Sequence, residues 1–431
     1  MSWSGGAYSA FSDTALVAAV RTPWIDCGGA LSLVSPIDLG VKVAREVLMR
    51  ASLEPQMVDS VLAGSMAQAS FDAYLLPRHI GLYSGVPKSV PALGVQRICG
   101  TGFELLRQAG EQISQGADHV LCVAAESMSR NPIASYTHRG GFRLGAPVEF
   151  KDFLWEALFD PAPGLDMIAT AENLARLYGI TRGEANSYAV SSFERALRAQ
   201  EEKWIDQEIV AVTDEQFDLE GYNSRAIELP RKAKLLIVTV IRGLAVFEAL
   251  SRLKPVHSGG VQTAGNSCAV VDGAAAALVA RESSATQPVL ARILATSVVG
   301  IEPEHMGLGP APAIRLLLAR SDLSLRDIDL FEINEAQAAQ VLAVQHELGI
   351  EHSKLNIWGG AIALGHPLAA TGLRLCMTLA HQLQANNFRY GIASACIGGG
   401  QGMAVLLENP HFGSSSARSS MINRVDHYPL S

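Results

Sequence analysis

Two segments from opposite halves of the chain repeat one plan: a glycine-containing turn, a helix and then an apolar strand. In the first half the turn spans 99–102, and apolar residues follow at helical spacing before a strand over 120–125. In the second half Gly365-His366-Pro367 precedes a similar helical pattern and a strand over 390–395. A duplication of this kind predicts two half-sheets side by side, with helices on both faces. Loops at matching ends of the two halves would then converge.

The length and composition predict an α/β protein of two or three domains. The chain has 431 residues, of which 48% are hydrophobic, and its 39 glycines suit tight turns and close backbone packing. We expect an N-terminal core over 10–128 plus 262–284 and a C-terminal core over 285–409. Charged helices and glycine- and proline-rich loops over 129–261 indicate an inserted loop, or lid, domain. Residues 410–431 lack apolar periodicity and predict a flexible tail.

Charge and hydropathy argue against nucleic acid and membrane partners. The net charge is −8, and the basic residues are dispersed except at 231–234, so no broad cationic face is expected. The longest aliphatic stretch, 235–241, is far shorter than the roughly 20 residues that cross a bilayer. Residues 1–10 lack a basic region followed by an apolar segment. We therefore expect a soluble, cytoplasmic protein.

The cysteines are widely spaced and predict neither disulfides nor a metal site. They lie at positions 27, 99, 122, 268, 376 and 396, with no Cys-x-x-Cys pair and no nearby paired histidines. This usage is typical of a cytosolic protein with reduced thiols. Cys122 and Cys376 have apolar neighbours and are interpreted as small core residues. Cys99 and Cys396 differ because glycine-rich turns follow them.

Cys99 is the candidate nucleophile. It follows an apolar segment and opens a helix, so backbone N–H groups and the helix dipole could stabilise its thiolate. On the residues alone, a buried structural cysteine is the better interpretation. Cys396 ends an apolar strand and precedes three glycines, which would let backbone N–H groups point into a cavity.

Two further side chains could complete such a site. His366 lies between glycine and proline, which would fix its orientation, and an imidazole with a near-neutral pKa could take the proton of Cys99. A histidine satisfied by backbone groups is the alternative. Asn334 ends a strand over 330–333 and begins a helical pattern over 335–345, so helix capping alone could explain it.

The order of these segments resembles the thiolase family, whose members exchange an acyl group between a protein cysteine and coenzyme A. The resemblance rests on Cys99-Gly100-Thr101-Gly102, Asn334-Glu335-Ala336, Gly359 to Pro367 and Cys396-Ile397-Gly398, with further fragments such as Thr263-Ala264-Gly265-Asn266 between them. It covers most of the chain. It implies a thiolase fold, with a duplicated five-layer αβαβα core, and an acyltransferase activity.

The resemblance also implies roles for individual residues. Cys99 would carry the acyl group after His366 activates it, and Asn334 would orient a water that stabilises an oxyanion together with His366. Cys396 would exchange a proton with the reacting carbon. The N–H groups of Gly398 and Cys99 would form a second oxyanion hole.

Coenzyme A and acyl-CoA are implied as substrates, with no permanently bound cofactor. The residues expected to contact them are Arg242, Cys268, Met167, His257, Ala336 and Met306. Several channel positions depart from the family pattern and make the channel more polar: Cys268 replaces a serine, His257 and Gln337 replace phenylalanines, and Asp166 replaces a histidine. The insertion from Arg139 through Met167 resembles the acetoacetyl-CoA-forming branch, so we expect short acyl chains.

Two other functions remain open. A related condensing enzyme could use another thioester, such as one on an acyl-carrier protein, although those enzymes usually have histidine or asparagine where Cys396 stands. A non-catalytic acyl-CoA-binding homologue is the second alternative. Family members assemble through a strand of the N-terminal domain, so a homodimer or homotetramer is expected.

Overall fold

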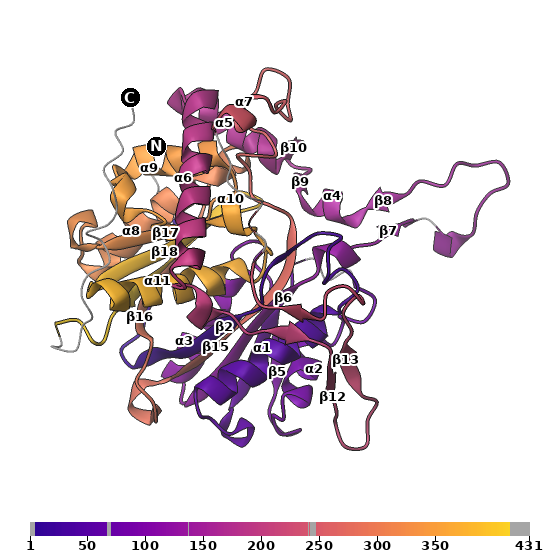
Figure 1. The fold of residues 1–431 in the computed structure, drawn as a ribbon, viewed down its shortest axis with the longest axis vertical. Coiled ribbons are helices and arrows are strands. Elements are labelled where there is room, and N and C mark those ends of the chain that lie inside the picture. The colour runs from indigo at the N-terminus through magenta and orange to yellow at the C-terminus, as the bar shows by residue number, and fades with distance from the viewer. Residues whose placement is uncertain (1–4, 67–69, 137, 240, 242–246, 414–431) are drawn as a thin grey trace.

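A computed structural model describes residues 5–66, 70–136, 138–239, 241 and 247–413 (Figure 1). The expected coenzyme A contact Arg242 and residues 414–431 of the expected tail lie outside the described residues. None of the helices in the described part of the chain is long and apolar enough to cross a membrane.

One large mixed sheet runs through the molecule (Figure 1). Its strand order is β17-β18-β19-β16-β2-β15-β6-β4-β5, with β1 beside β16 and β3 beside β15. The two halves meet where β2 (Thr14–Arg21) pairs antiparallel with β16 (Ala291–Gly300). The other strands are β1 (Ala7–Ala10), β3 (Ile25–Asp26), β4 (Ser60–Gly64), β5 (Ala92–Gly94), β6 (His119–Glu126), β15 (Val271–Arg281), β17 (Leu330–Ile333), β18 (Tyr390–Ile397) and β19 (Gln401–Glu408).

Helices cover both faces of each half of the sheet, which confirms the five-layer fold predicted from the sequence. On the N-terminal half, α1 (Pro36–Arg50) and α2 (Leu76–Tyr83) form one outer layer, and α3 (Thr101–Ser114) packs on the opposite face. On the C-terminal half, α8 (Pro310–Ser321) lies outside and α11 (Thr371–Asn386) lies inside. Since α3 and α11 also contact each other, they form the central layer.

The central strand β15 is apolar without interruption from Ala274 to Ala280, and the sheet explains why. Successive side chains of a strand point to opposite faces of a sheet. Ala274, Ala276 and Leu278 accordingly join the core beneath α1, whereas Ala275 and Ala277 join the core around α3 and α11. Both faces are buried, which favours apolar residues over 274–280, and the small alanines let the helices approach closely.

Two glycines allow α3 and α11 to cross backbone against backbone. A Cβ added to Gly102 would lie 2.5 Å from the backbone nitrogen of Leu373, and a Cβ added to Gly372 would lie 2.5 Å from that of Phe103. No side chain fits in this space, since real Cβ atoms do not approach backbone atoms so closely. The crossing brings together the first turns of both helices and the loops that precede them.

We expect Gly102→Ala to lower the free energy of unfolding by about 1–3 kcal/mol, because the added methyl group overpacks the helix crossing. Turnover should fall as well, since the displaced helices carry the candidate site. Denaturant unfolding and steady-state rates measure both effects.

Gly183→Ala is the matched control. Gly183 lies in the first turn of α6 (Arg182–Glu201), and its added Cβ would meet only Thr181 Oγ1, at 3.8 Å. Alanine there should be neutral or stabilise the protein by up to roughly 1 kcal/mol. Equal stability of the two variants would contradict the tight crossing.

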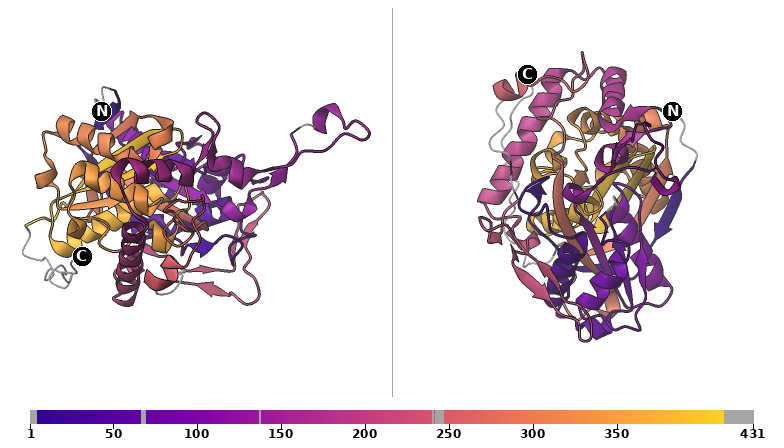
Figure 2. Two further views of the ribbon diagram at one scale, coloured as in Figure 1. Left: turned by 90° about the horizontal axis from the view of Figure 1, so that it is seen from above. Right: turned by 90° about the vertical axis from the view of Figure 1, so that its right-hand side faces the viewer.

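The segment inserted between β6 and β15, within the N-terminal half of the sheet, contains helices packed on the core and one projecting arm. The arm is the hairpin of β7 (Ile133–Ala134) and β8 (Lys151–Asp152), which extends away from the body (Figures 1 and 2). The other elements here are α4 (Phe153–Ala157), β9 (Phe159–Asp160), β10 (Leu165–Asp166), α5 (Met167–Tyr178), α6, β11 (Val212–Thr213), β12 (Glu215–Phe217), β13 (Arg225–Ile227), β14 (Leu235–Leu236) and α7 (Phe247–Ser251). The domain boundaries given above remain predictions.

Candidate active site

A cavity of about 140 Å³ brings together the two candidate thiols and the candidate imidazole. Cys99, Cys396 and His366 all line it. Four of the expected substrate contacts line the same cavity: Cys268, Met167, Ala336 and Met306. The rest of the lining is largely apolar. Segments almost 300 positions apart in the sequence therefore meet at one place, as the duplicated plan predicts.

A strained turn presents Cys99. The preceding residue, Ile98, has φ +46°, a conformation that is costly for a β-branched side chain and that concentrates at functional sites. Thr101 holds the turn, because its Oγ1 donates to the carbonyl of Ile98 at 2.7 Å and accepts from the N–H of Arg97 at 2.9 Å. The sequence motif located Cys99 but gave no sign of this strain.

Burial makes Cys99 a thiol rather than a thiolate in the resting cavity. The residue is 9% exposed, and burial raises its pKa to about 11. A hydrogen bond from the backbone N–H of Gly398 lowers the pKa in part, and the charge of Glu126 raises it further. The expectation that helix and backbone dipoles leave a stabilised thiolate is therefore wrong, because desolvation outweighs them. Cys99 needs a base.

His366 can supply that base as a neutral imidazole. Burial lowers its pKa to about 3, and the positive charge of Arg374 adds to the shift. The expectation of a near-neutral pKa is thus wrong, although a neutral ring is the form that accepts a proton. Its Nε2 lies 3.3 Å from Nδ2 of Asn334, and its Nδ1 lies 2.6 Å from Oγ1 of Thr371.

Asn334 does not cap the following helix, contrary to one interpretation of the sequence. The helix α9 (Ala338–Leu348) begins later, and Gln337 is its N-cap residue. The amide of Asn334 instead reaches the imidazole of His366. Its Oδ1 is buried and has no hydrogen-bond partner among the described residues, as expected of a group that holds a water or a substrate atom.

Cys396 lies at the end of β18, 1% exposed, beside the hairpin turn to β19. Burial raises its pKa above the ordinary range, and the nearby thiols of Cys99 and Cys268 raise it further. Gly399 and Gly400 both have φ +83°, so the turn requires glycine. The turn places Gly398 where its N–H reaches the sulfur of Cys99.

Glu335 joins the loops that carry Asn334 and His366 to helix α6, a role that the sequence did not indicate. Its carboxylate is buried. The groups that donate hydrogen bonds to it are the Tyr188 hydroxyl at 2.9 Å, the Ser192 hydroxyl at 2.6 Å, Asn356 Nδ2 at 3.0 Å and the N–H of Ile362 at 3.1 Å. Such a saturated carboxylate fixes the relative position of these segments.

Glu126 makes a comparable connection between the two halves of the sheet. It ends β6 and accepts hydrogen bonds from Ser65 Oγ at 3.0 Å and from the N–H groups of Met66 and Ala369, both at 3.0 Å. Ala369 belongs to the loop between His366 and α11. The sequence shows that Glu126 ends an apolar strand, which marks it as a candidate for a structural or functional role. Its hydrogen-bond partners cannot be inferred from the sequence, because they lie far away along the chain.

Two of the polar departures from the family pattern, Asp166 and His257, pair with each other. Asp166 lines the cavity and caps α5 by accepting from the N–H of Ala169 at 2.8 Å. Nε2 of His257 lies 3.0 Å from Oδ2 of Asp166, and the His257 side chain is 41% exposed. His257 itself does not line the cavity, so it reaches the cavity only through Asp166.

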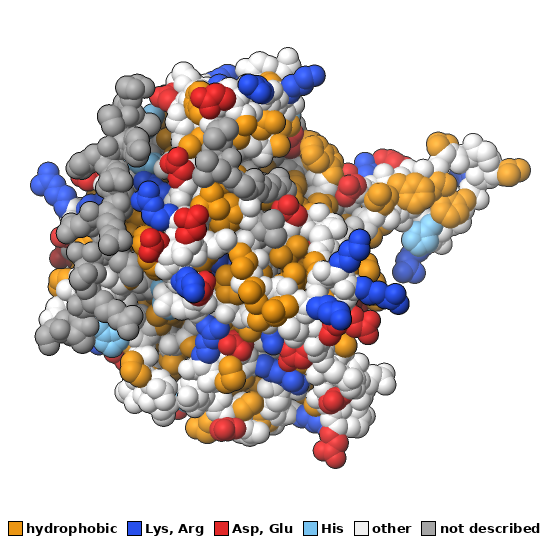
Figure 3. Space-filling view, in the orientation of Figure 1, with side chains coloured by type: hydrophobic (Ala, Val, Ile, Leu, Met, Phe, Trp, Pro, Cys, Tyr) orange, Lys and Arg blue, Asp and Glu red, His pale blue; other side chains and the backbone are white. Residues whose placement is uncertain are grey.

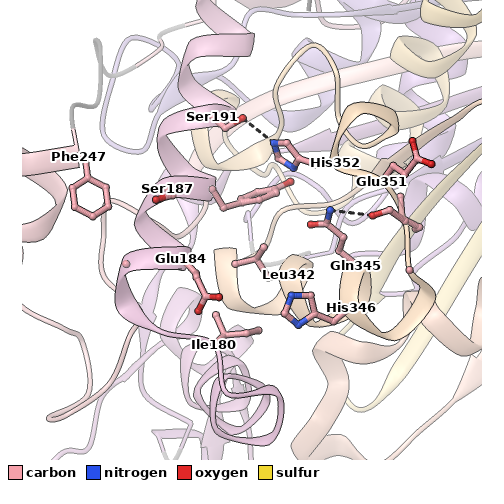
Figure 4. A pocket seen from close by; sticks show the side chains of 14 residues that line it. Ile180, Glu184, Ser187, Ser191, Phe247, Leu342, Gln345, His346, Glu351 and His352 are labelled. Carbon is pink, nitrogen blue, oxygen red and sulfur yellow. Dashed lines mark hydrogen bonds between the residues drawn. The ribbon is translucent and has the colours of Figure 1, made fainter. Parts of the chain in front are cut away.

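A larger cleft of about 810 Å³ lies elsewhere and contains none of the candidate catalytic residues. It is bounded by α6, α9 and residues 349–352, and Figure 4 shows His346 and His352 on one side of it and Ser187 and Ser191 on α6. Ser191 and His352 are hydrogen-bonded at 3.2 Å. The candidate chemistry therefore belongs to the smaller cavity.

The comparisons with known proteins agree with this arrangement. The model of the thiolase N-terminal domain matches residues 14–283, and that of the C-terminal domain matches residues 287–409. A bovine protein named mitochondrial 3-ketoacyl-CoA thiolase is 40% identical over 400 residues, which cover 91% of this chain and 98% of the relative.

Two solved structures share the fold. Human mitochondrial 3-ketoacyl-CoA thiolase in complex with CoA matches with a TM-score of 0.86 and 38% identity, over 92% of this chain and 98% of that one. The Bacillus anthracis acetyl-CoA acetyltransferase matches with a TM-score of 0.83 and 38% identity, over 93% and 99%. With both domain models matched along nearly the whole core, the chain belongs to the thiolase family.

Proposed function

We propose that this protein is an acyltransferase that uses coenzyme A to cleave 3-ketoacyl-CoA and, in reverse, condenses two acyl-CoA molecules. The observation that carries the proposal is the meeting of Cys99, His366 and Cys396 in one cavity. The neutral imidazole takes the thiol proton of Cys99, and the sulfur attacks a carbonyl carbon to give a thioester on the enzyme.

The third residue, Cys396, transfers protons to and from the other reacting groups. In cleavage, the bond between the α and β carbons breaks, and the Cys396 thiol gives its proton to the departing acetyl-CoA enolate. The Cys396 thiolate then takes the proton of coenzyme A, whose sulfur attacks the acyl group on Cys99. The bond between the acyl carbon and the Cys99 sulfur breaks, and His366 returns its proton to that sulfur. In condensation the same thiolate removes a proton from the methyl carbon of acetyl-CoA. His366 with Asn334, and the N–H groups of Gly398 and Cys99, hold the negative oxygens.

We also propose a preference for short acyl chains. The cavity is small, at about 140 Å³, which suits an acetyl or acetoacetyl group better than a long acyl chain. The polar Asp166–His257 pair at its edge would repel a long hydrocarbon chain. Met167, Cys268, Ala336 and Met306 would contact the thioester end of the substrate, since they line the cavity.

A series of 3-ketoacyl-CoA substrates of increasing chain length tests both parts of the proposal. Loss of the enolate absorbance should depend on added coenzyme A, and kcat/KM should fall at least about tenfold once the chain outgrows the cavity. A maximum at long chains would overturn the preference. No consumption of any member would favour a non-catalytic acyl-CoA-binding protein, and activity only with acyl-carrier-protein thioesters would favour a different condensing enzyme.

We propose a homodimer formed at strand β5, or a tetramer built from two such dimers. Strand β5 ends the sheet, and its outer edge has no partner strand among the described residues, with Leu93 49% exposed. The projecting arm also carries exposed apolar side chains (Figure 3), including Ile133, Phe142 and Leu144. Sedimentation velocity would detect these assemblies, and a monomer at micromolar concentration would contradict them.

For the compartment, we propose the cytoplasm. All six cysteines are free thiols, which suits a reducing environment. The bovine relative is named as mitochondrial, so the mitochondrion is the competing location. Fractionation of cells of the source organism distinguishes the two.

A further inference from the structure

We infer that Thr371 is a positioning residue that holds His366 in the tautomer required of a base. The inference rests on the proposed function of the site. Thr371 is the first residue of α11 and is completely buried, and its Oγ1 lies 2.6 Å from Nδ1 of the imidazole.

The surrounding hydrogen bonds give this contact a direction. A hydroxyl group has one proton, and Thr371 can donate it either to the carbonyl of Pro367 at 3.2 Å or to Nδ1 of His366 at 2.6 Å. In the first case the hydroxyl oxygen accepts from Nδ1–H of His366. The proton of the neutral ring is then on Nδ1, and the lone pair is on Nε2.

The other side of the ring selects the first case. Nδ2 of Asn334 lies 3.3 Å from Nε2 of His366, and an amide nitrogen can only donate. If the proton were on Nε2, two donors would face each other in a buried site. With the proton on Nδ1, both ring nitrogens have suitable partners, and Nε2 keeps the lone pair that can accept a proton from the thiol once the contact with Asn334 is released.

A hydroxyl group orients the ring without adding charge. In a Ser-His-Asp triad the third residue is a carboxylate, which both orients the imidazole and stabilises its protonated form. Thr371 can orient the imidazole, but it cannot stabilise the protonated form. His366 therefore stays neutral in the resting cavity, with one proton on Nδ1, and holds a second proton only while the oxygen of a bound substrate accepts the hydrogen bond from Nε2–H.

The experiment compares Thr371→Val with Thr371→Ser and with Thr378→Val. Valine keeps the shape of threonine but cannot accept from Nδ1–H. We expect kcat for thiolysis of acetoacetyl-CoA to fall about 10²-fold, as for the loss of an oriented general base, with KM nearly unchanged. Serine retains the hydroxyl group and should restore the rate to within a few fold of the wild type.

Thr378→Val is the matched control. Thr378 lies on the same helix and is also buried, and its Oγ1 donates to Glu208 at 2.7 Å, away from the imidazole. This variant should lose stability in thermal unfolding but keep kcat. Equal loss of kcat in both valine variants would show that Thr371 acts only through stability.

Two further outcomes separate the inference from the proposed function. A wild-type rate in Thr371→Val, or failure of serine to rescue, would overturn the role of Thr371 alone. A wild-type protein that neither cleaves acetoacetyl-CoA nor forms an acyl-enzyme would overturn the proposed function, and with it this inference.

Discussion

Replacing Cys99 with alanine is expected to reduce thiolysis of acetoacetyl-CoA by about 10⁴-fold or more, the order of loss seen when a nucleophile is removed. The remaining groups of the cavity can bind and polarise the substrate, but no acyl-enzyme can form. Steady-state thiolysis measures the loss, and electrospray mass spectrometry of the intact protein should detect no acyl adduct on the variant.

Cys27→Ala serves as the control for this variant. Cys27 is an exposed free thiol and does not line the cavity. Its removal should leave the rate and the acyl adduct unchanged. If Cys99→Ala retained more than about a tenth of the wild-type rate, another group would be the nucleophile, and Cys268 would be examined first because it lines the same cavity.

Replacing Cys396 with alanine should separate the two half-reactions. Acyl transfer from acetyl-CoA to Cys99 can proceed without Cys396, because coenzyme A can leave as a thiolate and take its proton from water, so one equivalent of coenzyme A should still be released in a burst. Condensation to acetoacetyl-CoA requires a proton to leave the methyl carbon, and it should fall at least about 10³-fold without the acid/base group. Stopped-flow detection of released thiol and steady-state synthesis measure the two steps.

Cys122→Ala is the control here. Cys122 lies in the core of β6, fully buried and outside the cavity, and its thiol donates only to the carbonyl of Leu105. It should lower stability modestly and leave the ratio of burst to turnover unchanged. Loss of the burst in Cys396→Ala would assign Cys396 to the first step and contradict the division of roles.

The fold was largely predictable because it follows from periodic patterns. The two turn-helix-strand segments gave the paired half-sheets. Thr181 and Glu184, three residues apart, form the capping box that begins α6, which is a pattern that a local sequence reveals. These features depend on residues close together in the sequence. The Gly102–Gly372 crossing could not be predicted, because it depends on which two helix faces meet.

The site was predictable as a set of residues but not as an electrostatic environment. Motif order identified Cys99, His366 and Cys396, whereas the pKa shifts of the first two arise from burial, which a local sequence does not reveal. Asn334 was open to a capping interpretation because the helix start cannot be placed to within a few residues. Glu126 contacts a loop 243 positions away, beyond the reach of any local pattern.

Peptide mapping of the trapped acyl-enzyme tests the central claim most directly. The Cys396→Ala variant is incubated with acetyl-CoA, digested at low pH and analysed by tandem mass spectrometry. The account predicts an acetyl group on the peptide that contains Cys99 and on no other cysteine. An acetyl group on Cys268, or on any residue other than Cys99, would contradict it.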